Sequence, residues 1–83
     1  MKEYMVLFYT HSGAIKFSRK AKKQGFDCEL MPVPRLLSSN CGVGAKTAFD
    51  GDPQQLVDEE IEKIYHNDEN SGQNKYVLVY SGD

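Results

Sequence analysis

The apolar positions in the first half of the chain fall into short runs separated by polar and glycine-containing stretches. Residues 3–9 form an apolar and aromatic run of the kind found in a central strand buried on both faces. The spacing of apolar residues from Ala14 to Gln24 predicts an amphipathic helix that Gly25 ends. Two further strands are predicted at residues 26–31 and 43–49.

The second half predicts another helix and a last strand. Asp52 can cap a helix, Pro53 suits its first position, and Gln55 completes a capping box. The apolar residues that follow have helical spacing to about His66, namely Leu56, Val57, Ile61, Ile64 and Tyr65. After a polar loop at residues 67–74, the alternation in residues 76–80 predicts the final strand.

The predicted order of elements is βαββαβ in a single domain, residues 1–83. Right-handed crossovers then give an α+β, ferredoxin-like fold, with a four-stranded antiparallel sheet and two helices on one face. In this fold the loop between the second and third strands lies at the same end as the start of the first helix. Residues 32–44 are therefore expected near residues 10–13.

Composition and charge exclude several classes of protein. A net charge of −2 over 83 residues argues against a protein-wide nucleic-acid or membrane footprint. Two cysteines are too few for a disulfide framework, and no apolar run is long enough to span a bilayer. Since no signal-peptide pattern is present, we expect a cytoplasmic protein with reduced thiols and no nucleic-acid or membrane partner.

Cys41 is the main candidate for chemistry. Two prolines end the preceding strand, and a Ser-Ser-Asn run just before the cysteine favours a turn. If the fold places this thiol near the first helix, the helix dipole, Arg35 and His11 would each lower its pKa and stabilise a thiolate or persulfide. The alternative is an ordinary surface thiol.

Cys28 has a different pattern, because it alternates with Leu30 along a predicted strand and is interpreted as a small core residue. The two cysteines form no CxxC motif, and together with His11 and His66 they match no zinc spacing. We therefore expect neither a metal nor a cofactor.

Charge is unevenly spread along the chain. The first helix is basic and the predicted second helix acidic, through Lys16, Arg19, Lys20, Lys22 and Lys23 in one and Asp58, Glu59, Glu60 and Glu62 in the other. The simpler interpretation is two solvated faces that attract each other weakly. The alternative is a basic docking surface for an acidic partner.

Tyr76, Leu78 and Tyr80 are expected to face away from the helices. Aromatic side chains on an open sheet can stack RNA bases, but residues 43–49 lack the basic-Gly-aromatic motif of RNA-binding sheets. A homodimer through the open sheet face is the favoured use of this patch.

The chain resembles the small bacterial selenium/sulfur-carrier-like domains. The resemblance is carried by residues 8–12 at the start of the first helix, by the Pro-x-Pro-Arg segment at 32–35, and by the Ser-Ser-x-Cys-Gly segment at 38–42. It implies a cytoplasmic bacterial protein of sulfur or selenium metabolism with Cys41 as the attachment site. The Cys-Pro-x-Pro motif of TusA-type proteins is absent, since Met31 precedes Pro32.

The function predicted from these observations is a non-enzymatic carrier rather than a stand-alone catalyst. Cys41 would accept a persulfide or selenide from a donor protein and deliver it to an acceptor enzyme. The residues expected to bind the cargo or stabilise the thiolate are Arg35, Ser38, Ser39, Gly42, Thr10, His11 and Ser12. The alternative is a dimeric ligand-binding or regulatory module, in which Cys41 is incidental.

Overall fold

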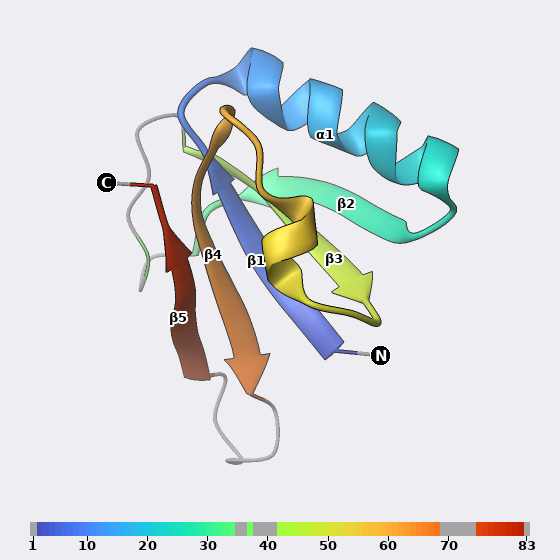
Figure 1. Cartoon of the computed structure of the whole chain (residues 1–83). Helices are drawn as coiled ribbons and strands as arrows, with labels where there is room; N and C mark the ends of the chain where they lie inside the picture. Colours follow the sequence, from blue (N-terminus) through green and yellow to red (C-terminus); the bar gives the residue numbers. More distant parts are fainter. Residues whose placement is uncertain (1, 35–36, 38–41, 69–74, 83) are drawn as a thin grey trace.

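The computed structural model describes residues 2–34, 37, 42–68 and 75–82. Its strands form one five-stranded antiparallel sheet, in the order β2-β3-β1-β4-β5, and α1 lies across one face (Figure 1). The elements along the chain are β1 (Lys2–Phe8), α1 (His11–Gln24), β2 (Asp27–Pro32), β3 (Val43–Phe49), the one-turn 3-10 helix η1 (Pro53–Leu56), β4 (Ile61–Asp68) and β5 (Lys75–Ser81).

β1 is the central strand and supplies both faces of the sheet with buried side chains. Val6 and Phe8 belong to the core cluster on the α1 side, where the Phe8 ring lies 5.4 Å from that of Phe17 between centroids. Met5 and Leu7 alternate with them and are also buried. A strand that is apolar on both faces therefore lies in the middle of the sheet, as its sequence predicts.

α1 has a capping residue at each end. The Thr10 hydroxyl oxygen accepts a hydrogen bond from the Gly13 amide at 3.1 Å, which satisfies one of the amides left open in the first turn. Gly25 ends the helix in the left-handed region, with φ 81°, and its amide donates to the Ala21 carbonyl at 2.9 Å. The predicted helix is therefore present.

The ferredoxin-like prediction was wrong, because the described chain has one α-helix and five strands instead of two helices and four strands. The helix-start signal is real: the Asp52 carboxylate accepts from the Gln54 amide at 2.9 Å. However, the chain leaves the helical region at Val57, where ψ is 131°. The Asp58 carboxylate then accepts from the Glu60 amide at 2.8 Å, and this local turn leads into β4.

A β-bulge explains why β4 resembled a helix in sequence. Ile61 pairs with Phe8 and Lys63 pairs with the preceding β1 residue, so Glu62 has no partner in β1. The extra residue restores Ile61 and Ile64 to the same face of the sheet, although they are three positions apart. Both are buried in the core cluster. Their spacing, which favours a helix in an uninterrupted pattern, here belongs to a bulged strand.

A second irregularity corrects the predicted face of β5. Ile64 pairs with Tyr80 and Tyr65 pairs with Leu78, so the residue between the two β5 positions is extra. Tyr80 consequently packs against the core cluster instead of facing away from α1. Leu78 is on the opposite face and is half-exposed, near Tyr76 and Tyr65, whose rings lie 6.5 Å apart. The predicted homodimer through this face stays a prediction.

Candidate functional site

The segment that carries Cys41 joins β2 to β3, and its base is closed by backbone pairing. Pro32 lies opposite Val43 in the ladder, and the Val33 amide donates to the Gly42 carbonyl at 3.0 Å. Gly42 has φ 72°, a conformation that glycine adopts without strain. The two ends of the connection are therefore held side by side.

This base lies at the end of the sheet where β1 ends and α1 begins. β3 runs antiparallel to β1, and Gly44, near its start, pairs with Leu7, near the end of β1. A Cβ atom on Gly44 would lie 2.9 Å from the Met5 sulfur and 3.3 Å from a Leu7 methyl carbon. A glycine is needed at this position because any larger residue would clash with two buried side chains of the neighbouring strand β1.

Four of the predicted site residues, Arg35, Ser38, Ser39 and Cys41, lie outside the described residues. The other four are exposed. Thr10, His11 and Ser12 are consecutive at the start of α1, and Gly42 is at the base of the β2–β3 connection. The described part of the site thus consists of a helix start and a loop base at one end of the sheet.

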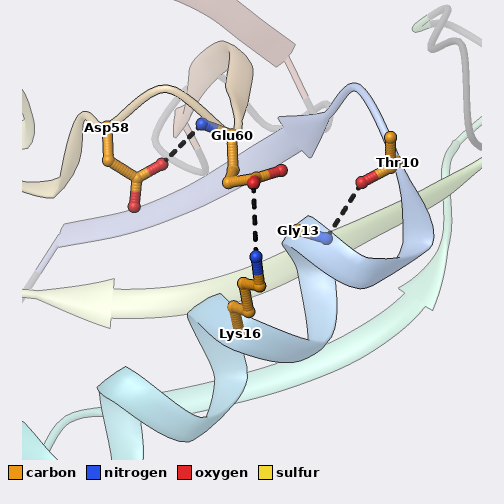
Figure 2. A network of polar contacts seen from close by, with 5 residues as sticks. All are labelled: Thr10, Gly13, Lys16, Asp58 and Glu60. Carbon is orange, nitrogen blue, oxygen red and sulfur yellow. Dashed lines mark hydrogen bonds and ion pairs between the residues drawn. The ribbon is translucent and has the colours of Figure 1, made fainter.

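The amides of Gly13 and Ala14, in the first turn of α1, already have acceptors within the chain. Gly13 donates to the Thr10 hydroxyl, and the Ala14 amide donates to the Thr10 carbonyl at 3.3 Å. α1 has no acidic residue in its own first turn. A negative charge near this turn comes instead from Glu60, in the turn before β4. One of its carboxylate oxygens lies 3.6 Å from the Lys16 ammonium (Figure 2).

Glu60 is the residue at this end that sequence reasoning missed. A Cβ atom on Gly13 would lie 2.7 Å from its carboxylate, so the side chain rests on the first turn of the helix. The Tyr9 amide also donates to the Glu60 carbonyl at 3.3 Å. A carboxylate is stabilised by the positive end of the helix dipole. Any anion bound at this helix start would therefore meet the Glu60 charge as well as the dipole.

The position of Glu60 could be found in sequence only by interpreting residues 58–60 as a turn. Asp58 is a residue type that accepts a hydrogen bond from the amide two positions on. The acidic run around it was instead assigned to a solvated helix. The contact between this turn and α1 joins segments far apart in sequence, and the residues around the turn do not indicate it.

Cys28 is a partly buried residue on β2. It packs against the core cluster, as predicted, but Leu30, which was predicted to share its buried face, is 39% exposed. Burial raises the pKa of the Cys28 thiol, while a hydrogen bond with Ser18 and the nearby charge of Lys22 oppose that shift more weakly. At neutral pH this thiol is protonated and a poor nucleophile.

Comparison with known protein families assigns the chain. The family described as "Putative Se/S carrier protein-like" matches residues 3–67. The chain belongs to this family. The matched residues run from β1 into β4 and include the whole β2–β3 connection with Cys41. No curated protein and no solved structure gave a significant match.

Membership of the Se/S carrier-like family confirms the resemblance drawn from the sequence. A carrier-like family name indicates a role in sulfur or selenium handling and contact with partner proteins. In the residues that the structure describes, no three His, Cys, Asp or Glu side chains are grouped to hold a metal ion. Over the same residues, no helix has the length and apolar character needed to cross a membrane.

Proposed function

We propose that this protein carries a sulfur or selenium atom on Cys41 and transfers it to a partner enzyme. The observation that carries the proposal is the family match, which includes the complete β2–β3 connection. The closed base of that connection supports it, because the Val33–Gly42 hydrogen bond holds the two ends of the connection together at the end of the sheet where α1 begins.

The proposed chemistry is a persulfide exchange that needs no oxidant. The Cys41 thiolate attacks the terminal sulfur of a donor persulfide, a new S–S bond forms, and the donor leaves as a thiolate. The resulting Cys41 persulfide is then attacked by a nucleophile on the acceptor, which takes the terminal sulfur and releases the Cys41 thiolate. A selenium atom would follow the same path, and net oxidation state is conserved in both steps.

We expect the negative charge of a Cys41 thiolate or persulfide to be stabilised more by loop residues than by the start of α1. Arg35 supplies a permanent cation in the same loop as Cys41, and Ser38 and Ser39 supply hydroxyl donors. The start of α1, with Thr10, would also attract an anion, but the Glu60 carboxylate beside Gly13 opposes that effect. We therefore assign Arg35 the larger part in offsetting the negative charge of a Cys41 thiolate or persulfide.

The test compares sulfur loading of variants that each lack one of the two cysteines. Protein is incubated with cysteine and a cysteine desulfurase, and intact mass is measured before and after reduction. We expect one added sulfur on wild-type protein and on Cys28→Ala, and none on Cys41→Ser. Sulfur that is added to Cys41→Ser, or to neither single variant, would refute the assignment of Cys41.

The pH dependence of alkylation gives an independent readout. Because burial raises the pKa of Cys28, its alkylation in folded Cys41→Ser protein should begin at higher pH than in the same protein unfolded in urea. For Cys41, measured in Cys28→Ala protein, we expect the reverse order, and Arg35→Gln should move its profile back to higher pH. A Cys41 profile that is the same folded and unfolded would argue for the ordinary surface thiol.

A further inference from the structure

The outer face of α1 concentrates positive charge in a chain that is negative overall. The helix, His11–Gln24, contains no Asp or Glu, whereas the whole protein has a net charge of −2. It holds half of the ten lysines and arginines, at positions 16, 19, 20, 22 and 23. This asymmetry is larger than solubility alone needs, since a mixed surface of both signs would serve that purpose.

Three of these cations form no ion pair with any residue that the structure describes. Among the described residues, ion pairs join Lys16 to Glu60 and Lys46 to Glu3, and none includes Arg19, Lys20 or Lys23. All three side chains are exposed. Together with Lys16 they line a shallow hollow of about 370 Å³ on the outer side of the helix.

An aliphatic side chain lies at the edge of this basic surface. Ile15 is 47% exposed, and Arg19 follows it one turn later on the same side of the helix. A large exposed aliphatic residue beside a group of charged side chains is typical of a protein–protein contact, in which apolar and polar groups adjoin. The exposed positions of α1 include no Phe or Tyr on which a nucleic-acid base could stack.

We propose that the outer face of α1, formed by Ile15, Lys16, Arg19, Lys20 and Lys23, docks an acidic protein surface. The fitting partner presents carboxylates around an aliphatic side chain, as an amphipathic acidic helix does. Charge complementarity selects that partner and speeds its association, while Ile15 supplies the apolar contact. The inference rests on this helix face and does not depend on Cys41 or on sulfur chemistry.

The test is a binding titration with a defined probe. Isotope-labelled protein is titrated with a synthetic helical peptide that carries glutamates around one leucine, and amide shifts are followed by NMR at low and high salt. We expect shifts confined to α1, with affinity that falls as salt rises because exposed charges are screened. A second peptide with glutamine in place of every glutamate is expected not to bind.

Three variants separate specific docking from general charge attraction. Lys20→Glu and Lys2→Glu change the net charge equally, but only Lys20 lies on the proposed face. We expect Lys20→Glu to weaken peptide binding about tenfold and Lys2→Glu to leave it within about twofold. Ile15→Ala should also weaken peptide binding. Equal effects of the two reversals, or none from Ile15→Ala, would overturn the proposal.

Two competing ligands complete the test. Single-stranded RNA and vesicles containing an anionic lipid are titrated under the same conditions. If either binds α1 more tightly than the acidic peptide does, the acidic-protein proposal fails. The titration repeated on Cys41→Ser should give unchanged affinity, so a failure of the carrier function and a failure of this docking surface remain distinguishable.

Discussion

The two faces of α1 differ in what they do for the protein. The inner face buries Ala14, Phe17 and Ala21, which are at most 4% exposed, against the sheet. Small residues at 14 and 21 allow the helix to approach the sheet, and Phe17 fills the space between them. The outer face is charged and makes little contact with the rest of the chain. Stability and recognition can therefore be altered separately on one helix.

Truncation of the inner face should have the largest effect. Phe17→Ala removes a ring that lies 5.4 Å from Phe8 and 6.1 Å from Phe26 between centroids. We expect it to lower the free energy of unfolding by about 3–5 kcal/mol, measured by urea denaturation. The matched control on the outer face is Lys20→Ala. Similar losses from the two variants would mean that the faces are not distinct.

Substitution at the seam between α1 and the turn before β4 should have an intermediate effect. In Gly13→Ala the new methyl would approach a Glu60 carboxylate oxygen to 2.7 Å and the Glu60 Cβ to 3.0 Å. We expect a loss of about 1–3 kcal/mol from this overpacking, against a smaller gain in helix propensity.

A double-mutant cycle with Glu60→Ala checks the cause of that loss. Because the closest contact is with the carboxylate, Gly13→Ala should cost less in the Glu60→Ala background. Additive losses would show that the strain arises elsewhere in the first turn.

Reversal of charge on the outer face should have the smallest effect on folding. Lys20 is exposed and none of the ion pairs of the described residues includes it, so Lys20→Glu should change the unfolding free energy by less than about 0.5 kcal/mol. The same variant is expected to bind the acidic peptide about tenfold more weakly. A clear loss of stability, seen in thermal denaturation, would assign Lys20 a structural role and weaken the separation of the two faces.

Local patterns were sufficient for residues 2–49. β1 is apolar on both faces, α1 has a capping threonine and a terminal glycine, β2 ends at Pro32, and β3 begins after Gly42, so these boundaries have a chemical cause in the adjacent residues. These signals act over a few positions and are strong enough to survive in the folded protein.

The second half could not be derived in the same way, because two of its features depend on neighbouring strands. The bulge at Glu62 changes which side chains share a face, and it exists only where β4 pairs with β1. Asp52 and Pro53 do start a helix, but the turn at Asp58 ends it after one turn. A capping signal marks where a helix can begin and says nothing about its length.

The candidate site was predicted to a similar extent. Thr10 is at the start of α1, where it caps the helix, and the loop base is at the end of the sheet where α1 begins. The carboxylate of Glu60 at that helix start was not expected. Glu60 lies about fifty residues further along the chain, in a turn that contacts the start of α1. The residues next to this turn in sequence do not indicate that contact.

The central place of β1 has a consequence for how the chain folds. One edge of β1 pairs with residues 44–49 and the other with residues 61–66, so neither edge is satisfied by its nearest neighbours in sequence. Pairings of such long sequence separation make folding slow, because the intervening chain must close before any contact is gained. During synthesis the apolar residues 4–8 have no strand to pair with until β3, and later β4, have emerged from the ribosome. Until then this apolar segment is exposed to aggregation in the nascent chain.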